Sequence, residues 1–197
     1  MYLSFYMDGF LITTDYQSDE YYAVEREVEE GFRTEIYDNE GNLTEIFELS
    51  EDEPSSQMAR GTGYVSRTFS SQKVESYLGV GLYGVKHTVI LNIYVYGSFK
   101  QIEGVADKMV TAADGIGIYT VENATSNVIA PNGYPTTSVD CTATAACEGA
   151  IDISVGVAAE LGFSVNGLIS AGVSVTGTVG TTVYFRNTIT HNWSISI

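Results

Sequence analysis

The 197-residue sequence contains few of the residues that cross-link or interrupt a fold: two cysteines and three prolines. Two cysteines cannot supply the disulfide framework on which small secreted domains depend. The two cysteines have no second pair of Cys or His ligands, because His87 and His191 are far apart in the sequence, so zinc coordination would stay unfilled and we expect no zinc site. A chain of this length can bury roughly 70% of its unfolded surface and needs no such staple.

Basic residues are also scarce, with nine Lys and Arg against 25 Asp and Glu. Phosphate backbones repel such a chain, so we expect no nucleic-acid partner. The charge is uneven, because 16 of the acids lie at or before Glu53, alongside only Arg26 and Arg33. The sequence predicts an acidic N-terminal segment, residues 1–58, with a strand and a β-hairpin that serve as a pro-region or an exchanged strand. A nearly neutral body, residues 59–197, follows.

Long uninterrupted apolar runs are absent from the sequence. The most apolar window, Tyr77 to Phe99, contains Gly79, Lys86 and Asn92, which argues against a membrane-spanning helix. Asp8 interrupts the apolar stretch near the start, so these residues are not expected to form a secretory signal.

The most informative pattern that is present is an alternation from Ile151 to Ile197, where nearly every odd-numbered residue is apolar or Gly. A period of two places one set of side chains on one face of a strand. Because the parity never changes, we expect turns of odd length at Asn166-Gly167-Leu168, Thr176-Gly177-Thr178 and Thr190-His191-Asn192. The run therefore predicts a C-terminal meander of three or four strands with one buried face.

Most of the remaining sequence also favours strands. Phe32 to Tyr37 and Leu43 to Leu49 flank the turn-forming residues 38–42, which is typical of a β-hairpin. Residues 101–113 are the exception, because their apolar side chains recur at helical spacing. We expect an all-β fold, an antiparallel β-sandwich of the jelly-roll or Ig-like kind, with at most one short helix near 101–113.

The cysteines leave two interpretations open. Cys141 and Cys147 are six positions apart in a segment expected to be mostly irregular. A disulfide would form if their Cα atoms approach within about 7 Å, and it would indicate an oxidising compartment. Otherwise both are buried free thiols.

Catalytic motifs are missing from the sequence. A Ser-His-acid arrangement needs a base, and His87 and His191 are the two candidates; His191 is expected to be a turn residue. The acidic runs are expected to be solvated, so no catalytic residue and no cofactor are assigned. Residues 15–20 and 38–42 gather oxygen ligands that suit Ca²⁺, but turn formation explains them more simply.

A membrane interpretation remains open beside the sandwich. Ile151 to Val165 and Ile169 to Phe185 are each long enough to cross a bilayer as strands. A sandwich sheet with one dry face would produce the same alternation. The membrane-insertion candidates are Ile151, Ile153, Val155, Val157, Leu161, Phe163, Val173 and Val175.

Three functional hypotheses follow. The first is a non-catalytic secreted or cell-surface protein that acts in binding or self-assembly, as a filament or adhesion-type subunit, with other copies as partners in a homo-oligomer or polymer. The second is a β-hairpin pore-forming toxin, for which a membrane is the target. The third is an acid/base hydrolase, which requires two carboxylates within about 10 Å in a cleft.

Overall fold

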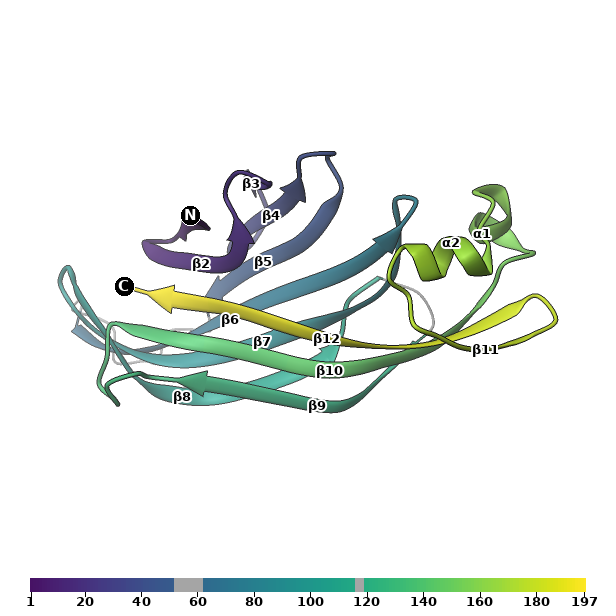
Figure 1. Ribbon diagram of the computed structural model, residues 1–197. Helices are drawn as coiled ribbons and strands as arrows, with labels where there is room; N and C mark the ends of the chain where they lie inside the picture. Colours follow the sequence, from purple (N-terminus) through teal and green to yellow (C-terminus); the bar gives the residue numbers. More distant parts are fainter. Residues whose placement is uncertain (52–61, 116–118) are drawn as a thin grey trace.

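The computed structural model, shown in Figure 1, describes residues 1–51, 62–115 and 119–197. Two antiparallel six-stranded sheets pack face to face, which confirms the predicted all-β sandwich. The first sheet has the order β1-β2-β12-β10-β9, with β11 also paired to β12. The second has the order β3-β4-β5-β6-β7-β8. The strands are β1 (Tyr2–Met7), β2 (Phe10–Gln17), β3 (Tyr21–Arg26), β4 (Phe32–Asp38), β5 (Leu43–Glu51), β6 (Thr62–Tyr77), β7 (Val80–Tyr96), β8 (Phe99–Ala112), β9 (Tyr119–Ile129), β10 (Ser138–Asp152), β11 (Val175–Val179) and β12 (Thr182–Ser196).

The acidic N-terminal residues contribute strands to both sheets. β2 pairs with β12 at the C-terminal end of the chain, and β5 pairs with β6. β4 and β5 form the hairpin expected around residues 38–42, where Asp38 Oδ1 accepts hydrogen bonds from the backbone N–H groups of Glu40 and Asn42. The boundary expected near residue 58 lies outside the described residues.

The sandwich interior follows the alternation most clearly along β12. Its odd-numbered side chains are buried from Val183 to Ile195, apart from the half-buried Asn187. Two clusters make up the core. The larger includes Phe10, Phe47, Phe69 and Trp193, and the smaller includes Tyr83, Phe163 and Phe185.

The helix expected near 101–113 is wrong, because these residues form β8 and pair with β7 along its length. The register shifts twice, so that Glu103 and Ala106 have no directly opposite residue on β7. Each bulge adds one residue to the strand. Ile102 and Val105 therefore share one face although they are three positions apart, and this spacing imitates a helix.

The C-terminal meander is also interrupted. Two short helices, α1 (Gly156–Glu160) and α2 (Val165–Ser170), lie between β10 and β11 at one end of the sandwich (Figure 1). The expected turns are wrong: the first lies in α2, the second in β11 and the third inside β12. Ser164 caps α2 by accepting a hydrogen bond from the Gly167 N–H, at 3.1 Å.

Candidate functional site

A cluster of buried polar side chains connects the two sheets. Glu45 of β5 and His191 of β12 are both 0% exposed, and Glu45 Oε1 lies 2.5 Å from His191 Nε2. Ser71 of β6 donates its hydroxyl hydrogen to Glu45 Oε1 and lies 3.0 Å from His191 Nε2. The expectation that His191 occupies a turn is wrong, because its odd number places it on the buried face of β12.

A second histidine lies beside this cluster. The Trp193 indole N–H donates to His87 Nδ1 at 3.1 Å, so this nitrogen carries no proton. His87 Nε2 lies 2.7 Å from Ser126 Oγ, which completes the hydrogen bonds of a neutral imidazole. Burial, together with the nearby His191 and Lys108, lowers the pKa of His87 to about 4.

The geometry of Ser71, His191 and Glu45 differs from a catalytic triad. In a triad the nucleophile contacts Nε2 and the acid orients the ring through Nδ1. Here Ser71 and Glu45 both contact Nε2, while Nδ1 has no hydrogen-bond partner among the described residues. Burial and Glu45 raise the pKa of the nearby Tyr16 hydroxyl. Hydrogen bonds and the ion pair of this cluster connect β5, β6 and β12, and the cluster is buried, so it exposes no nucleophile.

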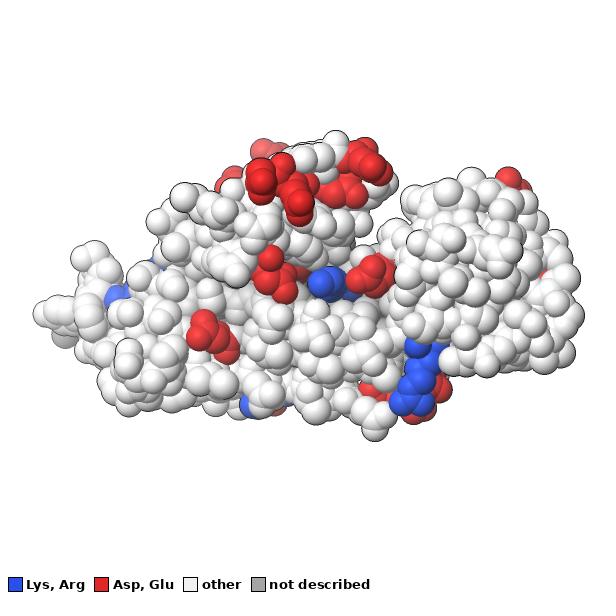
Figure 2. Space-filling view, in the orientation of Figure 1, with Lys and Arg blue, Asp and Glu red and all other residues white. Residues whose placement is uncertain are grey.

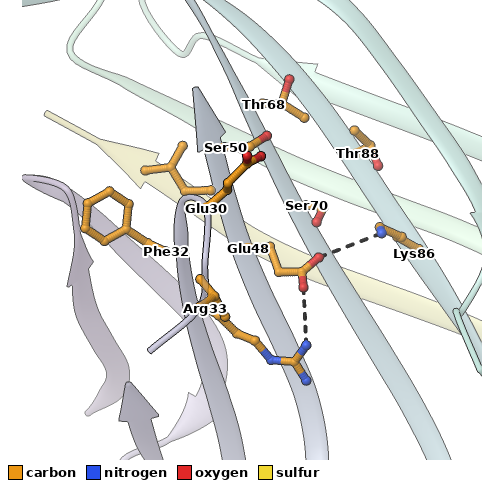
Figure 3. A pocket seen from close by; sticks show the side chains of 11 residues that line it. Glu30, Phe32, Arg33, Glu48, Ser50, Thr68, Ser70, Lys86 and Thr88 are labelled. Carbon is orange, nitrogen blue, oxygen red and sulfur yellow. Dashed lines mark hydrogen bonds and ion pairs between the residues drawn. The ribbon is translucent and has the colours of Figure 1, made fainter. Parts of the chain in front are cut away.

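A groove crosses the outer face of the second sheet (Figure 3). Its volume is about 340 Å³. Glu48 lies between two cations, 3.3 Å from Arg33 Nη1 and 3.8 Å from Lys86 Nζ. Hydroxyl groups from neighbouring strands line the other side, from Ser50, Thr68, Ser70 and Thr88. The charges compensate one another, so the groove does not select a ligand of one sign.

A different surface lies at the end of the sandwich that carries α1, α2 and β11, residues 153–181, which we call the helical end. These residues include one charged side chain, Glu160. Figure 2 shows this end almost free of charge, while acidic side chains gather over β3, β4 and β5. Five large apolar side chains are 43–70% exposed here, namely Val155, Val157, Leu161, Ile169 and Val179. Water therefore contacts much apolar surface at the helical end.

Apolar packing and a small set of hydrogen bonds hold the helical end against the sandwich. Phe163, Leu168 and Val173 are buried, and the Phe163 ring lies 4.8 Å from that of Tyr77, between centroids. Asn187 of β12 clasps the segment: its Nδ2 donates to Gly172 O at 3.0 Å, and its Oδ1 accepts from the N–H of Ser174 at 2.7 Å. α1 has no buried residue and no side-chain cap.

The membrane-insertion candidates lie in and beside the helical end, but not on one strand face. Ile151 is the penultimate residue of β10, Ile153 lies just beyond the strand, and both are half-buried. The remaining six divide by exposure: Val155, Val157 and Leu161 are exposed, Phe163 and Val173 are buried, and Val175 is half-buried. The alternating residues that predicted strands over 151–165 and 169–185 thus fold, between β10 and β12, as two short helices, their connections and the short strand β11.

The two cysteines are free and buried, so the disulfide interpretation is wrong and the alternative of free thiols holds. Cys141 and Cys147 both lie in β10, where six residues span about 20 Å. A disulfide needs Cα atoms within about 7 Å. Burial raises the pKa of the Cys147 thiol to about 11.

Over residues 1–51, 62–115 and 119–197, no group of three or more His, Cys, Asp or Glu side chains is placed to hold a metal ion. The oxygens of Asp38 are engaged by the hydrogen bonds of its own turn. No helix in this part of the chain has the length and apolar character needed to span a bilayer.

Comparisons with known proteins find no match: no family model, no curated protein and no solved structure resembles the chain. The chain's own residues are therefore what indicates a function. Among the surfaces described, the helical end departs furthest from an ordinary protein surface, because it combines exposed apolar side chains with one charged residue.

Proposed function

We propose that the protein is a non-catalytic, self-associating β-sandwich that acts outside the cell or on its surface, and that its copies meet through the helical end. The observation that carries this proposal is the exposure of Val155, Val157, Leu161, Ile169 and Val179 at one end of the molecule. Contact with a second copy would remove this apolar surface from water, at about 25 cal/mol per Å².

The unpaired edge of β11 also supports self-association through the helical end. Among the described residues, β11 pairs only with β12, and four of its five residues are exposed. An unpaired strand edge can add a strand from another chain through backbone hydrogen bonds. Val179, which is 70% exposed, places an apolar side chain on this edge.

The polar outer faces of the sheets support a place outside the cell. On β10 and β12 the outward side chains are mainly hydroxyl and amide groups, and pairs of them hydrogen-bond across the strands, such as Thr142 with Asn192 and Thr144 with Thr190. The buried position of Glu45, Ser71 and His191 supports a non-catalytic role, because no substrate reaches them. A hydrolase has no comparable support.

Light scattering after size-exclusion chromatography tests the self-association on the full chain. We expect an oligomer that dissociates on dilution, and we expect Val179→Lys to shift it at least tenfold toward the monomer. Thr178→Lys is the matched control, because Thr178 is the exposed neighbour on the same short strand. A wild-type protein that stays monomeric at every concentration contradicts the proposal. Residues 1–58 are kept, since their removal deletes β1 to β5.

A second candidate function, membrane insertion by a β-hairpin, is favoured by a different observation. The helical end begins where the ladder between β10 and β12 stops, and its sequence alternates as a strand would. Its single charged residue suits a lipid environment.

A further inference from the structure

β10 and β12 pair without a register shift over their whole length. The ladder runs from Ser138 opposite Ser196 to Asp152 opposite Thr182, and the two residue numbers of every pair sum to 334. The hydrogen bond from the Ile153 N–H to Thr181 O, at 3.0 Å, extends the ladder beyond the last pair. The chain then leaves this register and forms the helical end.

If the same register continued through the helical end, its two halves would pair with each other as one hairpin. The midpoint of the ladder falls on Gly167, so Asn166-Gly167-Leu168 becomes a three-residue turn between Val165 and Ile169. A glycine at such a turn allows the left-handed backbone that three-residue hairpin loops require. The pairs that would face each other are Val155 with Val179, Val157 with Gly177, Ala159 with Val175, Leu161 with Val173, Phe163 with Ala171, and Val165 with Ile169.

The two faces of this extended hairpin differ sharply in polarity. The odd-numbered face contains apolar residues and one glycine, as the facing pairs above show. The even-numbered face consists of small and polar residues with one carboxylate, namely Ser154, Gly156, Ala158, Glu160, Gly162, Ser164, Ser170, Gly172, Ser174, Thr176, Thr178 and Gly180. An apolar face opposite a polar one is the pattern of strands between lipid and water.

We propose that the helical end is a membrane-inserting β-hairpin stored in folded form, which enters a lipid bilayer as the in-register continuation of β10 and β12. This inference rests on the second candidate function. Residues 153–165 and 169–181 add 13 residues to each strand. At about 3.3 Å per residue they reach about 43 Å, whereas a tilted strand crosses the hydrocarbon core with about 9 to 11 residues.

The stored form is held mainly by the contacts of its apolar side chains with the smaller core cluster. α1 and α2 have five and six residues, far below the length at which a helix is stable alone. The transition melts both helices, separates β11 from β12 and releases the Asn187 clasp. Phe163, Leu168 and Val173 lose their contacts with the sandwich, and lipid replaces them. Strand edges cannot stay unpaired in lipid, so hairpins from several copies pair with one another.

Dye release from phosphatidylcholine vesicles tests the hairpin with two matched variants, Val157→Asp and Thr176→Asp. Both residues are exposed in the stored form, so each variant should fold. In the extended register they lie one residue apart in depth, on opposite faces. We expect wild-type protein to release dye, Val157→Asp to reduce the rate at least tenfold, and Thr176→Asp to stay within twofold of wild type.

The outcomes separate the hairpin from the self-association. A loss of release confined to Val157→Asp supports the hairpin. A wild-type protein that assembles in solution but releases no dye overturns the hairpin and leaves the self-association standing. Equal loss in both variants, with assembly retained, also overturns the hairpin, because the register predicts that only one face meets lipid. A protein that releases dye as a monomer overturns the self-association.

Discussion

Acidification should weaken the sandwich through His87. Its Nδ1 accepts the Trp193 N–H, so a proton at that nitrogen removes the acceptor. The charged ring would lie beside Ser126 of β9 and beside Trp193 and His191 of β12. The positive charge of Lys108 on β8 also opposes protonation. The carboxylate of Glu45 contacts His191 and forms no ion pair with His87. The folded state therefore resists protonation of His87 more strongly than the unfolded chain does.

The magnitude follows from the pKa of His87, which falls from 6.5 to about 4 on folding. Since one pKa unit corresponds to about 1.4 kcal/mol, the contribution to the free energy of unfolding is about 3 kcal/mol. The unfolded chain binds the proton first as the pH falls. Stability is thus lost progressively from about pH 6.5 down to about pH 4, and the loss is complete below that value. For a domain stable by about 5–15 kcal/mol this is a large effect.

Urea unfolding followed by the fluorescence of Trp193, the single tryptophan, measures this loss at a series of pH values. His87→Asn is the reference variant, because its Oδ1 can accept the Trp193 N–H and does not titrate. Carboxylates titrate in both proteins, so the difference between the two profiles isolates His87. We expect wild type to lose about 3 kcal/mol more than the variant between pH 7 and pH 4. Parallel profiles would refute the reasoning.

Two further predictions concern the connection between the sheets and the clasp of the helical end. Glu45→Ala leaves His191 and Ser71 buried without their partner and should lower the free energy of unfolding by about 3 kcal/mol; Glu48→Ala, on the outer face of the same strand, should cost below about 1 kcal/mol in the same urea titration. Similar losses would contradict the assigned role of the buried cluster. Asn187→Ala removes both hydrogen bonds to residues 172–174 and should raise the rate of dye release about thirtyfold, since the two bonds together contribute about 2 kcal/mol. Asn127→Ala, exposed on β9, is its control, and an unchanged rate in Asn187→Ala argues against the clasp.

The sequence anticipates those features that depend on local periodicity. The alternation along β12 and the turn residues 38–42 predict buried faces and a hairpin that the structure contains. Periodicity predicts a helix wrongly at residues 101–113, because the bulges at Glu103 and Ala106 each add a residue and convert a period of two into a spacing of three. The same parity indicates that His87 and His191 are buried, since both share the odd numbering of their buried neighbours.

The interactions between the sheets could not be predicted in this way. Ser71 and His191 are 120 positions apart and meet only because β6 and β12 belong to facing sheets. The prediction for the helical end is wrong for another reason. Its residues alternate as those of a strand do, but the tertiary contacts of Phe163, Leu168 and Val173 favour the helical conformation of the segment. Such conflicts between local pattern and fold are expected at functional sites.

The most direct test of the stored hairpin is a scan of lipid exposure along residues 155–165. An environment-sensitive dye is attached to single introduced cysteines, one position at a time; Cys141 and Cys147 are buried and should react slowly. On phosphatidylcholine vesicles, odd-numbered positions should report an apolar environment and even-numbered positions an aqueous one. A repeat of three to four residues, or no change from the protein in solution, would contradict the hairpin.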